Sequence, residues 1–375
     1  MRVVMTVSND LATDQRVQRV CATLAQEGHE ILLLGRKLSN SLPFESSTYR
    51  TKRLRLWFNR GPLFYAELNA RLFFILLFSR CSVMHANDLD TLLPVWLISK
   101  IRNKHLVYDT HEYFTGVPEI QKRPVVKAVW KRIEKFIFPK LKHVFTVNES
   151  IADLYRNDYG NKSIHVMRNI SPANVKIELA DDLVAGLPSN CFRIILQGNG
   201  INVDRGGEEA VQMMQYLDDC VLLIAGSGDV IQRLKEMVLE LNLSARVVFF
   251  ERMPYAKLLG LTTCCDLGLS LDKDTNINYR FSLPNKVFDY LRAGIPVLAS
   301  DLPEVRRIVE THQTGWIAAE VNPKALAEQI QRIKNDSNAY SNLRSRLRKA
   351  SLELCWENEC KALLNLYKGL EQSAL

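Results

Sequence analysis

Short apolar runs alternate with amphipathic stretches from one end of the chain to the other, and this alternation predicts parallel β-strands connected by α-helices. In the first half of the chain we expect strands at 3–7, 31–34, 83–85, 106–108, 144–147 and 164–167. The amphipathic stretches between them predict helices, including 14–26 and 123–141. The chain therefore begins with a domain of the α/β class.

A second series of the same kind follows a break. The periodicity fades between residues 171 and 190, a stretch that contains Pro172 and Pro188. Further strands are predicted at 193–197, 221–225, 246–250, 266–270, 296–299 and 314–317. From residue 324 onward the chain is predicted to be almost entirely helical.

This pattern predicts two Rossmann-like, doubly wound α/β domains that face a central cleft. We place them at 1–170 and 191–350, with a linker at 171–190 and a helix at 351–375 that packs back toward the first domain. In such folds ligands usually bind outside the carboxyl ends of the strands. The fold class alone does not name the ligand.

The length of 375 residues suits two domains that each bury their own core. No run of about 18 apolar residues occurs, so no transmembrane helix is expected. The first strand passes into Ser8-Asn9-Asp10 without the apolar core of a signal peptide. We therefore expect a cytoplasmic protein.

The net charge of +8 is unevenly placed, because Lys and Arg gather in the stretches 52–80 and 122–142, interleaved with Trp and Phe. Basic charge mixed with aromatic residues suits a protein on an anionic membrane surface, in this case the inner face of the cytoplasmic membrane. A solvated basic face above core-facing aromatic residues is an equally open alternative. Nucleic acid binding is not expected, since no recognised binding motif accompanies the charge.

The segment 282–297 carries the most chemical information. Ser282 is predicted to cap a helix, and Gly294 is predicted to end it in the left-handed conformation. Asn285, Lys286 and Asp289 then share one face of this helix. A helix N-terminus with a nearby Lys attracts a phosphate, and a carboxylate one turn deeper can hold a pair of sugar hydroxyls. Together they predict a nucleotide-sugar site.

Two glycine-containing turns lie in the same half of the chain. Gly198, Asn199 and Gly200 follow a predicted strand, and Arg205 stands just before the next helix, which favours a phosphate role over a plain tight turn. The dinucleotide fingerprint needs a third glycine where Val203 stands, so NAD binding is not supported.

Weaker candidates for the base or ribose are Gly226, which also ends a strand, and Met253, which follows another. A plain strand-to-helix turn explains Gly226 equally well.

In the first domain, Tyr108-Asp109-Thr110-His111-Glu112 leaves a predicted strand, and His111 can donate a hydrogen bond to a sugar hydroxyl or a phosphate. A purely structural role for this histidine stays open. Asp88-Leu89-Asp90 imitates a metal-binding Asp-x-Asp motif but lies away from the phosphate candidates, and Asp272-Lys273-Asp274 is expected to be a loop. We predict no metal and no cofactor.

These motifs, in this order, resemble the GT-B glycosyltransferases, and most of all bacterial members of glycosyltransferase family 4. The resemblance covers nearly the whole chain and is carried by three segments: the opening loop and helix at 8–17, the Asp-x-His-Glu element at 109–112, and the donor-site signature at 283–297.

The resemblance implies a retaining transfer of a sugar, of the hexosyl type, from a nucleoside diphosphate sugar without metal. It assigns the first domain to the acceptor, with Asn9, Asp10 and Glu112, and the second to the donor. Arg205 matches the phosphate-binding cation, Asp289 the acid that holds the ribose, and His111 a histidine near the transferred sugar. Backbone amides at Ser282 and Leu283 match groups that approach the donor.

Two residues depart from the family pattern, because Asn199 stands where Arg is common and Phe281 stands where the first of two paired Glu residues is usual. Lys286 is expected to replace part of the lost positive charge. The predicted function is sugar transfer to a glycan or lipid-linked acceptor in cell-surface polysaccharide biosynthesis, with Arg205, Lys286 and His111 as catalytic residues. The alternatives are a nucleotide-sugar epimerase of the same fold and a non-catalytic nucleotide-sugar-binding subunit.

Overall fold

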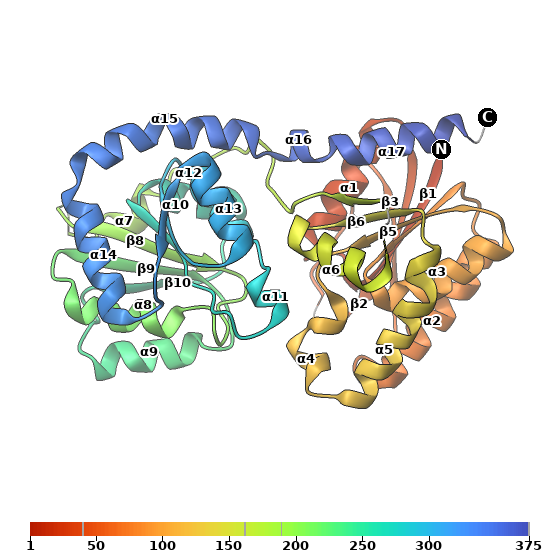
Figure 1. The fold of residues 1–375 in the computed structure, drawn as a ribbon, viewed down its shortest axis with the longest axis horizontal. Coiled ribbons are helices and arrows are strands. Elements are labelled where there is room, and N and C mark those ends of the chain that lie inside the picture. Colours follow the sequence, from red (N-terminus) through yellow and green to blue (C-terminus); the bar gives the residue numbers. More distant parts are fainter. Residues whose placement is uncertain (40, 161–162, 189, 374–375) are drawn as a thin grey trace. The chain divides into compact units, whose positions relative to one another are not determined.

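The chain folds into two compact units in the computed structural model, which describes residues 1–39, 41–160, 163–188 and 190–373. The first unit combines Met1–Asn169 with the C-terminal segment from Glu359 onward, and the second is Ile170–Asn358. Each unit contains one parallel β-sheet with helices on both faces (Figure 1). Both units are therefore doubly wound α/β folds, as the sequence predicts.

The sheet of the first unit has the strand order β3-β2-β1-β4-β5-β6-β7. Its strands are β1 (Arg2–Asp10), β2 (Glu30–Lys37), β3 (Arg50–Arg55), β4 (Val83–Asn87), β5 (His105–Thr110), β6 (His143–Thr146) and β7 (Ile164–Val166). β1 pairs in parallel with both β2 and β4, so the direction of winding reverses beside β1. Ligands of doubly wound sheets usually bind at such a reversal, outside the carboxyl ends of the strands.

Every strand predicted from the sequence is present, and β3 is an additional one that the sequence pattern does not reveal. Its sequence, Arg-Thr-Lys-Arg-Leu-Arg, buries only Leu54 and exposes most of its basic side chains. An edge strand tolerates this composition, because charged side chains on the edge prevent pairing with another sheet. The basic residues of β3 overlap the start of the basic stretch 52–80 that the charge pattern indicates.

The helices of the first unit cover its sheet in the usual crossover arrangement. They are α1 (Gln15–Gln26), α2 (Gly61–Phe78), α3 (Leu89–Ile101), α4 (Pro118–Gln121), α5 (Pro124–Ile137), α6 (Glu149–Tyr159) and α17 (Lys361–Gln372). The predicted helix at 14–26 starts one residue later, because Asp14 is its N-cap and accepts a hydrogen bond from the Val17 amide. The predicted helix at 123–141 stops at Ile137, and Pro139 follows in a short 3₁₀ turn.

α2 is the one helix of the described residues that is long and apolar enough to cross a membrane by length and composition, with a mean hydropathy of 1.3 over 18 residues. In the fold it connects β3 to β4 and buries a row spaced four residues apart, Phe64, Leu68, Leu72 and Leu76. Only 22% of this helix is buried. The helix thus has one core-facing row and a large apolar surface that the core does not use.

The second unit has the strand order β10-β9-β8-β11-β12-β13, also parallel throughout. Its strands are β8 (Phe192–Gly198), β9 (Cys220–Gly226), β10 (Val247–Phe250), β11 (Leu267–Ser270), β12 (Val297–Ser300) and β13 (Gly315–Ala318). Successive residues of β8 enter opposite core clusters, since Ile194 and Leu196 pack on one face and Ile195 on the other.

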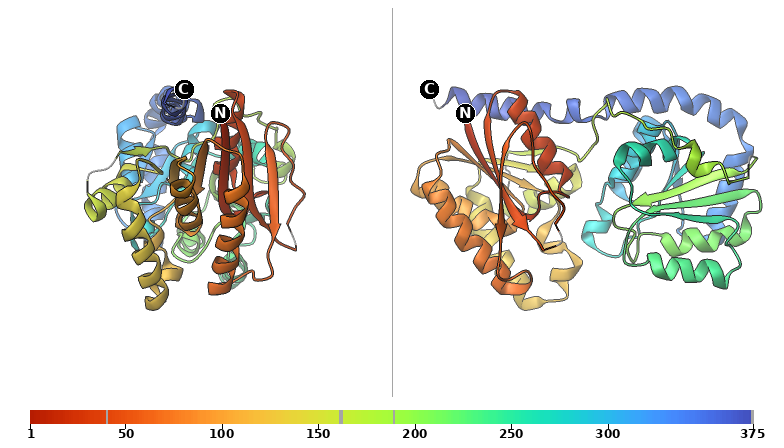
Figure 2. Two further views of the ribbon diagram at one scale, coloured as in Figure 1. Left: turned by 90° about the vertical axis from the view of Figure 1, so that its right-hand side faces the viewer. Right: turned by 180° about the vertical axis from the view of Figure 1, so that it is seen from behind.

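Helices cover both faces of this second sheet (Figure 2). They are α7 (Asp181–Val184), α8 (Gly207–Met213), α9 (Ile231–Glu240), α10 (Tyr255–Thr263), α11 (Ile277–Arg280), α12 (Asn285–Ala293), α13 (Pro303–His312), α14 (Pro323–Asn335) and α15 (Ser337–Glu353). α12 is the helix predicted from segment 282–297, and Gly294 ends it at φ 76° as expected. Its N-cap is Pro284 and not Ser282, so the predicted cap is wrong by two residues.

The boundaries of the units differ from the expected ones. Residues after Asn169 already belong to the second unit, where Ile170, Ala180 and Val184 join an apolar core cluster, so 171–190 packs as part of a domain. The second unit continues to Asn358, because α15 contributes Leu347 and Ala350 to the same cluster. The chain then passes through the one-turn α16 (Trp356–Glu359) to α17, which belongs to the first unit.

Candidate active site

Two basic side chains of the second unit meet at one buried carboxylate. Arg205 lies between β8 and α8, Lys286 lies in the first turn of α12, and Asp272 follows the carboxyl end of β11. Nη1 of Arg205 donates to Oδ1 of Asp272 at 3.2 Å, and Nζ of Lys286 is 3.9 Å from the same oxygen. Arg205 and Lys286 are predicted from the sequence, whereas Asp272 is expected there only as part of a loop.

This cluster carries more positive than negative charge. The Asp272 side chain is 1% exposed, and within the described residues its Oδ2 has no hydrogen-bond partner. Burial lowers the pKa of Lys286, Asp272 opposes this effect, and Arg205 adds to it. The Arg205 guanidinium also lies 4.2 Å from the ring centroid of Tyr279, and this cation–π contact helps to hold it in place. Two cations that share one carboxylate are suited to an incoming anion of higher charge.

The residues predicted to bind the donor at and near the start of α12 differ from one another in burial. The Ser282 hydroxyl is buried and, among the described residues, lacks a hydrogen-bond partner. Leu283 packs against the apolar core, as does Met253, and both side chains are only partly buried. Asn285 is exposed to solvent.

Asp289 is already engaged inside its own unit. Its carboxylate accepts hydrogen bonds from the Tyr255 hydroxyl at 2.6 Å, the Ser171 hydroxyl at 3.3 Å and Nε2 of Gln197 at 3.3 Å. The residue is 7% exposed. Burial raises the pKa of Tyr255, and the nearby Asp289 charge raises it further, so the tyrosine remains a donor to this carboxylate. A ribose at this site would have to share Asp289 with these three donors.

The two glycine turns pack against each other. A Cβ on Gly226, which has φ 132°, would lie 1.9 Å from the carbonyl oxygen of Gly198. The Ser227 amide donates to that same oxygen, and the Ile201 amide donates to the Ser227 carbonyl. Packing alone therefore explains the glycine at 226. Gly200 differs, because the nearest atom to an added Cβ would be 3.8 Å away and the residue is exposed beside Asn199.

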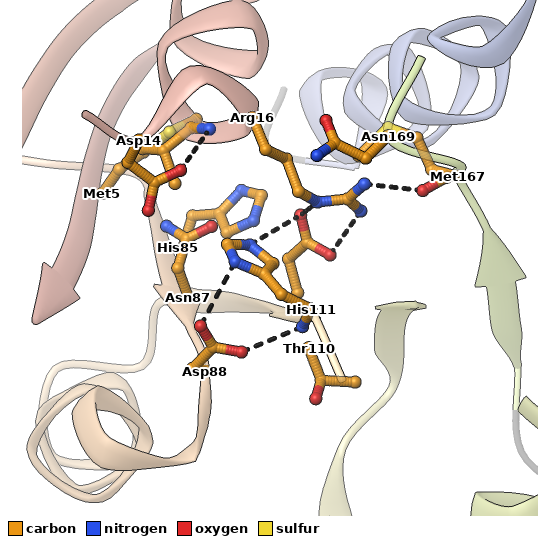
Figure 3. Close-up of polar contacts among 12 residues, drawn as sticks. Met5, Asp14, Arg16, His85, Asn87, Asp88, Thr110, His111, Met167 and Asn169 are labelled. Carbon is orange, nitrogen blue, oxygen red and sulfur yellow. Dashed lines mark hydrogen bonds and ion pairs between the residues drawn. The ribbon is translucent and has the colours of Figure 1, made fainter. Parts of the chain in front are cut away.

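In the first unit His111 lies between two carboxylates (Figure 3). Its Nδ1 is 3.2 Å from Oδ2 of Asp88, and its backbone amide donates to Oδ1 of the same residue at 2.9 Å. On the other side, its Nε2 is 3.7 Å from Oδ2 of Asp109. Burial by itself would lower the pKa of His111, but Asp88 and Asp109 raise it to about 9. At neutral pH the ring therefore carries a positive charge.

A buried arginine holds Asp109 in place. Nε and Nη2 of Arg16 donate to the two oxygens of Asp109 at 3.0 and 2.7 Å, and Nη1 donates to the Met167 carbonyl at 2.7 Å. Burial raises the pKa of Asp109, but Arg16 and His111 outweigh this and lower it well below its usual range. Arg16 is part of the 8–17 segment, but sequence patterns do not show that its partner is Asp109, which lies 93 positions later in the chain.

A second histidine of this unit is joined to the C-terminal helix. Nδ1 of His85 lies 2.9 Å from the Tyr367 hydroxyl, and both side chains are fully buried. Burial lowers the pKa of His85 to about 4, so this ring is neutral. At neutral pH the first unit therefore contains one neutral histidine, His85, and one protonated histidine, His111.

The predicted acceptor-side residues make contacts within the first unit. Asp10 forms an ion pair with Arg53 at 2.6 Å and accepts a hydrogen bond from Ser41, so β3 helps to fix it. Nδ2 of Asn9 donates to Asp14 at 3.2 Å. Glu112 is exposed. In the part of the chain that the structure describes, no group of three or more His, Cys, Asp or Glu residues is arranged to hold a metal ion.

Comparison with known proteins matches each half of the chain to a glycosyltransferase family model. Residues 14–170 match the family model described as Glycosyltransferase Family 4, and residues 204–352 match the one described as Glycosyl transferases group 1. Two curated relatives are chitobiosyldiphosphodolichol beta-mannosyltransferases. The protein from Dictyostelium discoideum is 30% identical over 125 residues, 32% of this chain and 24% of that protein. The protein from Candida glabrata is 22% identical over 315 residues, 74% of this chain and 67% of that protein.

Solved structures share the whole fold. The sucrose-phosphate synthase of Thermosynechococcus elongatus has a TM-score of 0.82 at 18% identity, with 100% of each chain covered. HepE of Anabaena in complex with UDP and glucose has a TM-score of 0.78 at 14% identity, covering 98% of this chain and 100% of that one. WaaG, a glycosyltransferase of lipopolysaccharide biosynthesis, has a TM-score of 0.65 at 12% identity and covers 96% and 98%. At these identities the similarity is one of fold.

Proposed function

This chain is a glycosyltransferase of the GT-B fold, and we propose that it transfers a hexose from a nucleoside diphosphate sugar to a glycan or lipid-linked acceptor in cell-surface polysaccharide biosynthesis. Support for the donor class comes from HepE, whose solved complexes contain UDP, UDP and glucose, or UDP-glucose. The names of the curated relatives specify a sugar linked through a diphosphate to dolichol, which supports a lipid-linked acceptor.

The observation that carries the proposal is the meeting of Arg205 and Lys286 at Asp272. When the bond between sugar and diphosphate breaks, negative charge grows on the departing phosphate, and fixed cations stabilise that charge without reorganising. Arg205 and Lys286 take this role, Asp289 anchors the nucleotide, and His111 acts beside the sugar. The proposed reaction retains the configuration of the sugar, and the leaving phosphate itself accepts the proton of the acceptor hydroxyl.

The first test measures sugar transfer by the Arg205→Ala and Lys286→Ala variants. Removing one such charge-stabilising group costs about 2.7–4 kcal/mol in comparable sites, so we expect turnover to fall about a hundredfold or more while the fold is kept. Lys235→Ala, which removes an exposed cation from the helix α9, is the matched control. Wild-type turnover in both variants would show that Arg205 and Lys286 do not stabilise the departing phosphate.

The reaction itself is tested with a panel of nucleotide sugars and a membrane extract as the source of acceptor. Nucleotide release that depends on the acceptor supports transfer, and the anomeric configuration of the product, read by NMR, tests retention. Sugar conversion without acceptor would point to an epimerase, and binding without turnover to a non-catalytic subunit. Metal-independent transfer predicts that EDTA leaves the rate unchanged.

We also propose that the first unit binds the surface of an anionic membrane. The helices α2 and α5 both pack against α3, and each exposes large apolar side chains, which we call the α2–α5 surface: Leu63, Phe74, Phe78, Val125, Val129 and Phe136. Basic side chains lie on the same helices or beside them, and Nζ of Lys140 is 3.2 Å from the ring centroid of Phe136. Such a surface suits the boundary between acyl chains and anionic headgroups.

Co-sedimentation with vesicles tests this surface. We expect binding to vesicles that contain phosphatidylglycerol at low salt, weaker binding at high salt, and a loss of binding in the double variant Phe74→Ser/Phe78→Ser. Leu239→Ser is the matched control, because Leu239 is an equally exposed residue of α9 in the second unit. Equal sedimentation of the double variant and the wild type would leave the α2–α5 surface as an ordinary solvated face.

A further inference from the structure

The backbone at Asp88 adopts a conformation that a non-glycine residue rarely takes. Its φ is 59° and its ψ is 165°, at the point where β4 ends and α3 begins. An Asp at this N-cap position would normally bond the amides of the first helical turn, but this side chain makes no capping hydrogen bond. The unusual backbone therefore has to be explained by another contact of the Asp88 carboxylate.

That contact is His111. One carboxylate oxygen of Asp88 accepts the His111 backbone amide at 2.9 Å, and the other lies 3.2 Å from Nδ1 of the same residue. The backbone amide of Asp88 in turn donates to the Asp109 carbonyl at 2.9 Å, which ties the end of β4 to the end of β5. Two contacts from one carboxylate fix both the position of His111 and the orientation of its ring.

Among Arg16, Asp109 and Asp88, the three residues in direct contact with one another or with the ring, the charges balance only when His111 is protonated. The buried pair Arg16 and Asp109 is neutral, and Asp88 adds one negative charge beside it. A neutral His111 would leave that charge unpaired in a largely buried place, which is costly. An imidazolium restores neutrality and directs the Nδ1 proton toward Asp88. Its Nε2, 3.7 Å from Asp109, has no hydrogen-bond partner among the described residues and so keeps a proton that it can donate.

We propose that Asp88 is a positioning residue that holds His111 as an imidazolium, so that the first unit offers the reaction a fixed cation and hydrogen-bond donor and not a proton-accepting base. The inference rests on the proposed sugar transfer for its functional meaning. It assigns a role to the Asp88-Leu89-Asp90 motif that involves no metal.

Other titratable groups face this site. Besides Asp88 and Asp109, the charge on His111 interacts with Arg16, His85 and Asp90, and Asp14 lies near Asp88. Burial raises the pKa of Asp90, Asp88 adds to this, and the value reaches about 7, so Asp90 loses much of its charge in weak acid. Burial also raises the pKa of Asp88 itself, and His111 opposes that rise. The charges of Asp88 and His111 thus depend on each other, because the His111 charge lowers the pKa of Asp88 and the Asp88 charge raises the pKa of His111.

The experiment titrates His111 by NMR, with the ring signal assigned from the spectrum that His111→Gln lacks. In the wild type we expect a pKa well above 7. In Asp88→Asn, which keeps an oxygen for the His111 amide and has nearly the size and shape of Asp, we expect that pKa to fall by at least about one unit. Glu149→Gln removes an exposed carboxylate of the same unit and should leave the His111 pKa unchanged.

The pH profile of turnover gives the second measurement. The upper limb of the wild-type profile should follow the His111 pKa, and in Asp88→Asn it should move to lower pH by the same amount, a shift that a purely structural role would not produce. A wild-type His111 pKa at or below about 6.5 overturns the proposal even if Asp88→Asn does not fold. Because the NMR titration needs no sugar transfer, a failed transfer assay counts against the proposed function alone.

Discussion

Asp272 is a buried carboxylate at the place that we propose as a phosphate site. Its buried carboxylate stands where negative charge would repel a diphosphate, yet it is also the partner that holds Arg205 and Lys286 together. We expect Asp272→Asn to bind inorganic pyrophosphate several-fold more tightly than the wild type, because the two cations lose their internal counter-charge. Isothermal titration calorimetry measures this directly.

The same substitution should weaken the unliganded protein. Removing one partner of a buried ion pair leaves uncompensated charge and typically costs about 3–5 kcal/mol, which urea unfolding would show. Asp274→Asn, at a carboxylate 53% exposed in the same loop, should change neither quantity. Weaker pyrophosphate binding by a folded Asp272→Asn protein would mean that Asp272 is not a counter-charge to the site.

Two glycines that look alike in the sequence are expected to respond differently to substitution. Gly226→Ala places a Cβ 1.9 Å from the Gly198 carbonyl oxygen at a positive φ, so we expect a loss of several kcal/mol of stability or failure to fold. Gly200→Ala has room for the methyl group and should unfold at nearly the wild-type urea concentration. If the backbone near Gly200 receives the diphosphate, that variant should still bind nucleotide more weakly.

Sequence patterns at this scale identify the residue but not its partner. Gly294, Arg205, Lys286 and His111 stand out because each has a local signature, a helix stop, a glycine turn or a strand end. Asp88 and Asp272 also lie in visible Asp-x-Asp patterns, but those patterns suggest a metal site or a loop, because the contacts of both carboxylates depend on side chains that the fold brings from distant segments. The hydrogen-bonding partners of Asp289 are hidden for the same reason.

At the scale of elements, apolar periodicity predicts what is buried and fails where burial is slight. The strands that contribute several buried side chains are all predicted. β3 is missed, because it buries only Leu54 and its basic sequence lacks the apolar pattern of a strand. α2 presents the opposite case, because its apolar residues surround the helix and the pattern does not show which row faces the sheet. Only the fold distinguishes the row Phe64, Leu68, Leu72 and Leu76 from the exposed apolar side.

The docking of α17 gives a prediction for an element. The Tyr367 hydroxyl bonds Nδ1 of His85 inside the first unit, so Tyr367→Phe leaves a buried ring nitrogen without its partner. We expect a loss of about 1–3 kcal/mol in the free energy of unfolding, measured with urea at pH 7.5. Tyr216→Phe changes an exposed tyrosine of the second unit and should have no effect.

The pH dependence of stability has opposite contributions from the two histidines. The pKa of His85 is lowered to about 4 in the folded state, so below about pH 6.5 the unfolded chain takes up a proton that the folded chain refuses, and stability falls as the pH drops toward 4. The pKa of His111 is raised to about 9, so its contribution is complete below about pH 6.5 and is lost as the pH rises through 9. We expect His85→Gln to flatten the acid side of the stability profile and His111→Gln to flatten the alkaline side.

For the whole molecule, alternation of strands and helices along the sequence is enough to predict two doubly wound units. It does not predict where one ends and the next begins, because Pro172 and Pro188 interrupt the local pattern while the residues between them still pack into the second core. The C-terminal helix is expected to pack back toward the first domain, and α17 does belong to the first unit. The residue at which the chain leaves the second unit, Asn358, is set by packing and has no local signal.

This arrangement predicts how the chain behaves when it is divided. The second unit is one continuous segment with a core on each face of its sheet, so the fragment 170–358 should fold and bind a nucleoside diphosphate by itself. The fragment 1–169 lacks α17 and loses the buried side chains of Leu363, Tyr367 and Leu370 from its core. Each such loss typically costs about 2–5 kcal/mol, and their sum is comparable with the whole stability of a domain.

We therefore expect the fragment 1–169 to be unfolded or only marginally stable, and to gain a cooperative unfolding transition when a peptide of residues 359–375 is added. Circular dichroism and calorimetric titration of the peptide would follow this gain. The same peptide with Leu363→Ala and Tyr367→Ala is the control and should not restore folding, because both residues it lacks are fully buried in the intact unit. If the fragment 1–169 alone unfolded as cooperatively and at the same urea concentration as with the peptide, α17 would contribute little to the first unit, and the contact between Tyr367 and His85 would then have no part in stabilising it.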